Sequence, residues 1–296
     1  MKYTYKAILG LVTVGMLTFS ACDTEELHDL NINTQAVNEI NMNFLFSAAE
    51  LSLADGGVES NRFLNWRTNV GYASYWMQHL ANSGGGGLAS GDKYFVNVES
   101  DDAPWDYGYG GLLKNVTEVL KQTGPGGFEE GRRKNTREAA RIIRAFAFLR
   151  ITDFYGNVPY SEAGQGIEGI FFPAYDTQES IYNALFQELE QAGAAISTAN
   201  PDDGFAAADM IYNGDVGKWK RWANSIMLRM AMRISNVNPG LAAEKATLAL
   251  SGAGVFSSNA DIAWVPHSEG PSQWTNQNGL SRAFLPGDGG QSRVMS

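Results

Sequence analysis

The sequence contains very little of the chemistry on which metal and thiol sites depend. Its 296 residues include one cysteine, Cys22, and three histidines, His28, His79 and His267. A single cysteine excludes a disulfide within the chain, and the histidines lack the spacing of zinc ligands. A Gly-x-Ser-x-Gly nucleophile motif is also absent. We therefore expect no metal, no cofactor and no catalytic nucleophile.

Positive charge and long apolar runs are scarce as well. Lysine and arginine number 22 against 32 acidic residues, which gives a formal net charge of −10. This balance argues against a nucleic-acid partner, because affinity for nucleic acid comes largely from basic groups that neutralise phosphates. The apolar run at residues 7–19 has 13 residues, whereas a helix needs about 20 to cross a bilayer.

The start of the chain has the pattern of a secretory signal. Two lysines precede the apolar run, and the small residues Ser20 and Ala21 follow it, directly before Cys22. We expect residues 1–21 to be a signal peptide. The order small-small-cysteine resembles a bacterial lipobox, in which the cysteine becomes lipidated. The alternative is an ordinary signal peptide with an unrelated cysteine nearby.

A lipid on Cys22 explains why an exported chain has one unpaired cysteine. Two or more acyl chains hold a protein firmly at a bilayer, so we expect a lipid anchor there. Residues 22–41 are polar and rich in asparagine, which is typical of a tether. Their acidic stretch, residues 23–26, resembles the signal by which Bacteroidetes place lipoproteins on the outer face, although a solvated tether also explains it.

The first third of the remaining chain predicts short elements. Residues 42–55 and 61–83 have the pattern of helices, and the glycines at 84–87 break the second one. Residues 93–98 favour a short strand. Pro104 suits the first turn of a helix that we expect over residues 105–122.

A long helix is predicted at the centre of the chain, within residues 135–160, and Gly156 marks its end. Arg150 and Asp153 are three positions apart, so they could pair with each other. Three arginines lie opposite the apolar face. That face consists of Ala139, Ile142, Ile143, Phe146 and Leu149.

Two further helices follow, with recognisable caps. Asp176 has the capping-box distance from Glu179, and Asp215 can cap a helix over residues 218–235 that we expect to be buried almost all round. Pro239 suits the start of another helix. Consecutive helix pairs joined by loops predict a mostly α fold of the α-solenoid type. The apolar stripe of the first of these helices is Ile181, Leu185, Leu189, Ala192 and Ile196.

The segments "EAARIIRAFAFLRITDFYGNVPYSEA" (residues 138–163) and "GDVGKWKRWANSIMLRMAMRIS" (residues 214–235) resemble the SusD/RagB family of outer-membrane lipoproteins, and residues 101–120 do so more loosely. The resemblance implies tetratricopeptide-like helix pairs with an irregular, loop-rich lobe. It also implies a surface protein, not an enzyme, that captures oligosaccharide or peptide for a TonB-dependent, SusC-like transporter. Residues 42–296 would then be a SusD-like helical domain that is incomplete at its C-terminus.

Aromatic residues in glycine-rich loops are the candidate ligand site. Trp105, Tyr107 and Tyr109 lie beside glycines, and Trp274 lies among amides. Aromatic rings stack on the apolar faces of sugars, and glycine lets a ligand approach the backbone. Trp105 could instead pack inward. Other aromatic residues at helical spacing are expected in the core, namely Trp66, Tyr72, Tyr75, Trp76, Trp219 and Trp222.

Two other functions stay open on the sequence alone. A lipid-anchored glycoside hydrolase needs two facing carboxylates, and the pairs at 101–102 and 202–203 are candidates. Aspartate is also favoured in turns for local hydrogen bonding, without any catalytic role. A purely adhesive or structural surface protein would show partner binding but no small ligand.

Overall fold

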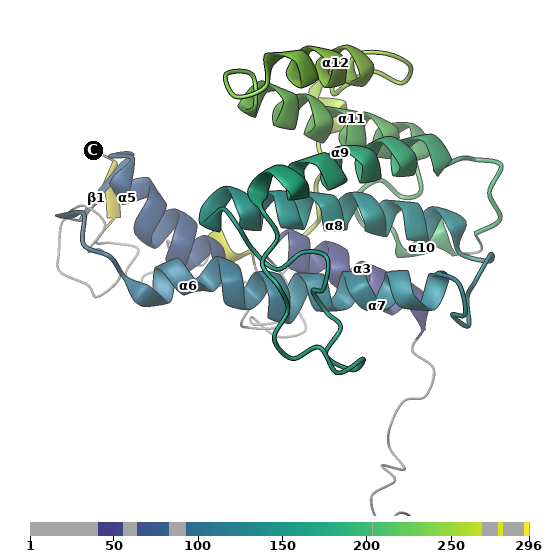
Figure 1. The fold of residues 1–296 in the computed structure, drawn as a ribbon, viewed down its shortest axis with the longest axis horizontal. Helices are drawn as coiled ribbons and strands as arrows, with labels where there is room; N and C mark the ends of the chain where they lie inside the picture. The colour runs from purple at the N-terminus through teal and green to yellow at the C-terminus, as the bar shows by residue number, and fades with distance from the viewer. Residues whose placement is uncertain are drawn as a thin grey trace, which may run out of the picture. The chain divides into compact units, whose positions relative to one another are not determined.

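The computed structural model describes residues 41–55, 64–82, 93–202, 204–267, 278–280 and 293–295, and these are mostly helical (Figure 1). The first helices are α3 (Met42–Leu53), a π-type helix η1 (Leu64–Ala73) and the short α5 (Ser74–Trp76). A continuous helical segment follows, made of α6 (Val98–Tyr107), the π-type η3 (Gly108–Leu113) and α7 (Lys114–Thr123).

The remaining helices pack one on the next. Contacts join α7 to α8, α8 to α9, α9 to α11 and α11 to α12, which is the stacking of an α-solenoid. The predicted mostly helical, helical-pair fold is therefore confirmed. The elements are α8 (Lys134–Tyr155), α9 (Gln178–Ala195), α10 (Phe205–Ala208), α11 (Val216–Arg233), α12 (Pro239–Ala249) and the 3₁₀ turn η4 (Asn259–Asp261).

Strand pairing in the described residues is confined to β1 (Leu80–Asn82) and β2 (Arg293–Met295), which are antiparallel with Leu80 opposite Met295. The strand predicted at residues 93–98 is wrong. Asn97 instead caps α6, because its side chain accepts a hydrogen bond from the Ser100 N–H at 3.1 Å. The helix thus begins seven residues before the predicted start at Trp105.

Pro104 lies inside α6 and removes one N–H from its hydrogen-bond ladder. Proline has no N–H, so the Ser100 carbonyl has no helical partner; the Thr68 hydroxyl donates to it at 2.7 Å. One residue further on, the Tyr155 hydroxyl accepts from the Trp105 N–H at 3.1 Å and donates to the Asp101 carbonyl. Side chains from η1 and α8 therefore complete the ladder of α6.

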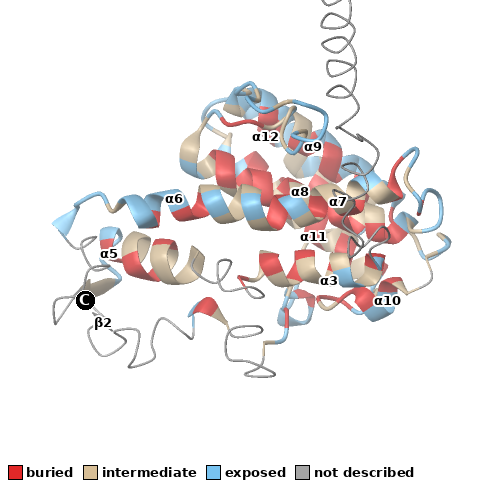
Figure 2. Ribbon diagram, turned by 90° about the horizontal axis from the view of Figure 1, so that it is seen from below, coloured by how far each residue is buried: buried red, intermediate tan, exposed pale blue. Residues whose placement is uncertain are grey.

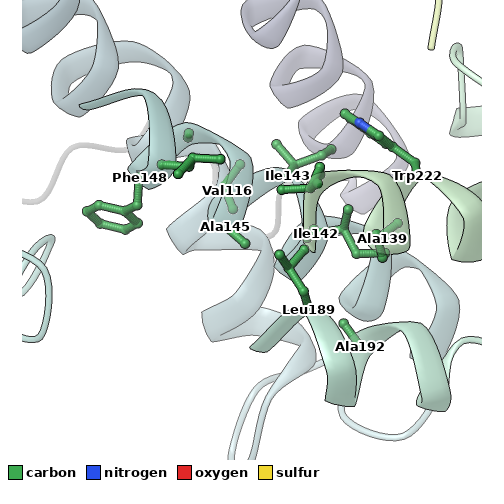
Figure 3. Close-up of a cluster of buried hydrophobic side chains, with 14 of the residues drawn as sticks. Val116, Ala139, Ile142, Ile143, Ala145, Phe148, Leu189, Ala192 and Trp222 are labelled. Carbon is green, nitrogen blue, oxygen red and sulfur yellow. The ribbon is translucent and has the colours of Figure 1, made fainter. Parts of the chain in front are cut away.

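The core is centred on α8 (Figure 2), and its residues Ile142 and Ile143, labelled in Figure 3, are completely buried. Leu149 is buried as well. The predicted stripe of α9 is buried throughout, and Trp219 and Trp222 lie in the core as expected. Helix α11 is not buried all round, because the Met232 side chain is 63% exposed. Trp76 was expected in the core but is exposed.

Buried polar groups connect α3 to the loop before α11. The Asp209 carboxylate accepts from the Trp219 indole N–H at 2.7 Å and from three main-chain N–H groups of its own loop. Glu50 of α3 accepts from the Met210 N–H at 2.7 Å. Burial, reinforced by the neighbouring Asp209 charge, raises the pKa of Glu50 to about 10. Glu50 is therefore neutral at physiological pH.

One of the two predicted helix caps is confirmed, because Asp215 caps α11. Helix α12 begins with Pro239 in its first turn, as expected, and Asn238 caps it. The cap predicted at Asp176 is wrong, because the Thr177 hydroxyl accepts from Ser180 and caps α9. Among the described residues, no helix is both long enough and apolar enough to cross a membrane.

Candidate ligand-binding site

Four aromatic side chains from separate elements meet at one place, here called the aromatic cluster: Trp105, Tyr109, Tyr155 and Tyr175. The ring centre of Trp105 lies 4.9 Å from that of Tyr109 and 5.4 Å from that of Tyr155. Tyr175 lies nearly parallel to Trp105, with an interplanar angle of 23° and centres 6.1 Å apart. Offset stacking and edge-to-face packing are the favourable geometries for such rings.

The loop between α8 and α9 brings Tyr175 to the cluster. Val158 and Asp176 form an isolated antiparallel bridge that closes this loop, which descends across α6 and α7 in Figure 1. The Asp176 carboxylate accepts from the N–H groups of Tyr160 at 3.0 Å and Ser161 at 2.8 Å. Partial burial raises the pKa of Asp176, but these hydrogen bonds outweigh it and hold the pKa below its ordinary value.

Two tyrosine hydroxyls in the cluster are occupied by the protein itself. The Tyr109 hydroxyl donates to the Pro159 carbonyl at 2.6 Å, and the Tyr155 hydroxyl bridges the main chain of α6. Burial raises the pKa of Tyr155 to about 12, so it stays protonated and remains a donor at neutral pH. The hydroxyls of these two tyrosines are therefore structural, whereas Tyr175 is exposed.

Further exposed aromatic residues lie on the same loop as Tyr175 and beside Tyr155 in the sequence. The Tyr175 side chain is 63% exposed, and Phe171 and Phe172 on the same loop are exposed as well. Phe154, next to Tyr155, is also exposed, and their ring centres are 6.0 Å apart. Clustered exposed apolar groups mark a binding surface more often than scattered ones. A flat ring with one free face can stack on the apolar face of a sugar.

The predicted site residues are only partly brought together. Trp105 and Tyr109 are in contact. Trp105 was expected either in the ligand site or packed inward, and it does both: it packs against the core and it stacks on the exposed ring of Tyr175. Tyr107 is the last residue of α6 and is half-buried. Trp274 and Cys22 lie outside the described residues.

Tyr175 was not predicted from the sequence. The signal was the aromatic segment "FFPAY" at residues 171–175, which follows a glycine-rich stretch. Its relation to Trp105 depends on closure of the loop by the Asp176 hydrogen bonds, and sequence spacing does not reveal that closure.

A row of rings continues from the cluster into the interior. Tyr109 meets Phe148 edge-on with centres 6.2 Å apart, and Phe148 meets Tyr160 at 4.7 Å. The Arg144 guanidinium lies 5.7 Å from the Tyr160 ring centre. Phe148 thus contacts two tyrosines, one that precedes α8 in the sequence and one that follows it.

The acidic pairs at residues 101–102 and 202–203, which were candidates for a hydrolase, lie in different environments. Asp202 accepts from the Thr136 N–H at 2.6 Å and lies 3.5 Å from the Arg133 guanidinium, so it anchors the start of α8. Asp101 and Asp102 are exposed on α6, and Asp203 lies outside the described residues. In the part of the chain that the structure describes, no three His, Cys, Asp or Glu residues are arranged to hold a metal.

Stacked helix pairs that carry a partly exposed aromatic cluster define a helical-repeat binding protein. Residues 34–287 match the model of the SusD-like family, described as starch-binding associating with outer membrane. The chain therefore belongs to the SusD-like family.

Solved structures agree with this assignment. A chitin-binding protein is 32% identical, with a TM-score of 0.72 over 86% of this chain and 51% of its own. A SusD-like protein from Bacteroidetes AC2a is 27% identical, with a TM-score of 0.70 over 86% of this chain and 46% of its own. A chitin-binding SusD homolog from Flavobacterium johnsoniae is 23% identical, with a TM-score of 0.69 over 86% of this chain and 50% of its own, and shows the shared fold.

The chain thus spans about half the length of the solved structures that it matches. No curated protein matches the sequence. The relatives that are named by a ligand are binding proteins, which agrees with the expectation that this chain is not an enzyme.

Proposed function

We propose that the chain is a cell-surface lipoprotein that binds oligosaccharide through the aromatic cluster. The observation that carries the proposal is the near-parallel stack of Trp105 and Tyr175, in which Tyr175 is 63% exposed. A protein core does not need a stacked pair with an open face, whereas a sugar ring needs a flat aromatic platform. The family description and the relative named a chitin-binding protein support a polysaccharide ligand.

Binding at this platform requires little rearrangement of the protein. Hydrogen bonds to Asp176 hold the loop that carries Tyr175, and the Tyr155 hydroxyl holds the turn of α6 that carries Trp105. A preorganised site spends less of its interaction energy on ordering side chains. The sugar would stack its apolar face on the rings and leave its hydroxyls to water and to nearby polar groups.

The anchor and the partner are further parts of the proposal. Cys22, which directly follows the signal peptide at residues 1–21, would carry the acyl chains. Residues 22–41 would tether the SusD-like domain to the outer face of the outer membrane. A TonB-dependent, SusC-like transporter would receive the ligand, which is an oligosaccharide or a peptide. Incorporation of labelled palmitate into the wild type, abolished by Cys22→Ser, tests the anchor; unlabelled wild type would refute it.

The ligand site is tested by calorimetric titration of the full chain with chito- and malto-oligosaccharides. Tyr175→Ala should weaken binding about tenfold, because loss of one stacking contact costs roughly 1.4 kcal/mol. Phe44→Ala is the control, since Phe44 is an exposed aromatic residue of α3 that does not belong to the cluster. Equal affinity in wild type and Tyr175→Ala would contradict the proposed site.

The same titrations separate the two alternative functions. Release of shorter sugars that stops when one carboxylate is replaced would establish a hydrolase. Binding to another protein, with no affinity for any oligosaccharide or peptide, would establish an adhesive or structural role. Ligand-induced stabilisation without turnover is the result expected for a binding protein.

A further inference from the structure

A cavity lies along the arginine-bearing face of α8, on the N-terminal side of Phe148 and Tyr155, which share that helix face. It has a volume of about 540 Å³. We call it the arginine groove and define it by Arg137, Arg141, Arg144, Tyr160, Glu188 and Gln191. The three arginines follow one another at intervals of four and three residues, so they share one helix face.

Two of these arginines already have acidic partners. Arg144 makes a two-point contact with Glu188, at 3.1 Å through Nε and 2.9 Å through Nη2. Arg141 contacts Glu138 at 2.9 Å and the Gln191 amide oxygen at 2.8 Å. Paired guanidinium and carboxylate groups of this kind are satisfied within the protein.

Arg137 has no such partner among the described residues. Its Nη1 donates to the Leu120 main-chain oxygen at 2.7 Å, and it forms no ion pair there. Burial lowers the pKa of Arg137, and the cations of Arg141 and Arg144 lower it further, against the opposing effect of Glu138 and Glu188. The face therefore holds three guanidinium groups against two carboxylates, in a chain whose net charge is −10.

The positive face extends beyond the groove. A neighbouring cavity of about 360 Å³ also has Arg137 in its wall, together with Lys134 and the acidic residues Glu130 and Glu138. Glu130 accepts from the Gly126 N–H at 2.9 Å, and Glu138 is paired with Arg141. From Lys134 to Arg144 the helix rises roughly 15 Å. A track of this length exceeds one small anion and matches a short oligosaccharide.

We propose that the arginine groove and the adjoining cavity bind an acidic oligosaccharide, with a sugar carboxylate at Arg137. A guanidinium accommodates a carboxylate with two parallel hydrogen bonds, and a partly desolvated cation without an ionic partner gains most from such a ligand. The inference rests on the proposed function, because it assigns a second subsite and an anionic ligand class to a glycan-binding chain. The neutral-sugar platform at Tyr175 is a separate surface.

The experiment compares an oligogalacturonate, a neutral chito-oligosaccharide and inorganic sulfate in calorimetric titrations of the full chain. Arg137→Gln should weaken oligogalacturonate binding by about tenfold or more, the loss expected for one charged hydrogen-bonding group. Lys114→Gln is the control for charge alone, since Lys114 is exposed at the start of α7. Arg137→Lys keeps the charge but loses the paired hydrogen bonds, so its affinity should lie between those of the wild type and Arg137→Gln.

A second variant covers the case in which Arg137→Gln fails to fold. Gln191→Glu is isosteric and exposed, and it places a carboxylate beside Arg141. It should also weaken oligogalacturonate binding, and neutral-sugar binding should stay as in the wild type. Raising the salt concentration should weaken the acidic ligand alone, because ionic contacts are screened.

Each outcome decides between the two proposals. Equal oligogalacturonate affinity in wild type, Arg137→Gln and Gln191→Glu would overturn the acidic subsite. Neutral-sugar binding without any oligogalacturonate binding would overturn it too, while the proposed function stands. If inorganic sulfate binds as tightly as oligogalacturonate and also depends on Arg137, the groove binds free anions and the oligosaccharide subsite is overturned. If replacing Arg137 weakens the binding of oligogalacturonate but not of the neutral sugar, the acidic subsite is supported and is distinct from the aromatic cluster.

Discussion

The hydroxyl of Thr68 donates to the main-chain oxygen of Ser100 at 2.7 Å, across 32 positions of sequence. In a regular helix the Ser100 carbonyl would accept from the N–H of residue 104, but Pro104 has no N–H. Both Thr68 and Ser100 are completely buried, so water cannot replace the missing bond. A side chain of η1 thereby permits a proline inside α6, one residue before the candidate ligand-binding Trp105.

Replacing Thr68 with valine tests this arrangement. The substitution keeps the shape but leaves the buried Ser100 carbonyl unsatisfied, so the free energy of unfolding should fall by about 1–3 kcal/mol. Urea denaturation measures the loss. Thr247→Val is the control, because the Thr247 hydroxyl makes a similar hydrogen bond at an exposed position. In a Pro104→Ala background α6 supplies its own N–H, and the cost of Thr68→Val should shrink; an unchanged cost would contradict the account.

Replacing Tyr155 with phenylalanine removes the hydroxyl between the Trp105 N–H and the Asp101 carbonyl. We expect α6 to shift at Trp105 and oligosaccharide affinity to fall severalfold, because a small displacement of a preorganised group weakens binding. Calorimetric titration measures the affinity. Tyr94→Phe removes an exposed hydroxyl that accepts from Gln78 and should leave affinity unchanged. Wild-type affinity in Tyr155→Phe would show that the bridge does not position the site.

Replacing Asp176 with alanine should release the loop that carries Tyr175. Amide hydrogen exchange should accelerate at Tyr160 and Ser161, whose N–H groups donate to this carboxylate. Since the pKa of Asp176 is held below its ordinary value, the stabilisation is present at neutral pH and disappears as pH falls through the lowered pKa. Ile167→Ala is the control, since Ile167 is exposed on the same loop. Unchanged exchange in Asp176→Ala would sink this explanation.

Glu50 predicts a dependence of stability on pH. Its pKa rises on folding from an ordinary value of 4.5 to about 10, so between these values the folded state holds a proton that the unfolded state has lost. Stability therefore decreases as pH rises through this window, by at most about 1.4 kcal/mol per pH unit. Glu50→Gln keeps the size and cannot ionise, so its stability curve should be flatter.

The measurement for Glu50 is urea denaturation between pH 7.5 and 9.5. Asp55 also has a pKa raised by burial, to about 7 despite the opposing charge of Arg150, and this interval lies above it. Parallel pH curves for wild type and Glu50→Gln would show that Glu50 is not the titrating group.

The long helices could be predicted from the sequence because their signals are local. The 3.6-residue apolar period marks α8, α9 and α11, and caps at Asp215 and Asn238 fix two of the starts. The start of α6 was misplaced because proline favours a first turn, and the compensating donor, Thr68, is remote in the sequence.

Polar side chains were the least predictable part. Arg150 and Asp153 have the spacing of a helical pair, but they do not pair with each other. Asp153 contacts Arg233 at 3.0 Å and Tyr182 at 2.5 Å. Arg150 interacts electrostatically with Asp55 instead. Asp176 has the spacing of a capping box but binds a distant turn. Tertiary partners decided these contacts, and Tyr175 was missed for the same reason.

The ring of Phe148 touches Tyr109 on the side of the aromatic cluster and Tyr160 on the side of the arginine groove. One buried side chain therefore lies between the proposed sugar platform and the arginine groove. A larger or smaller residue at that position would shift both of these tyrosines at once.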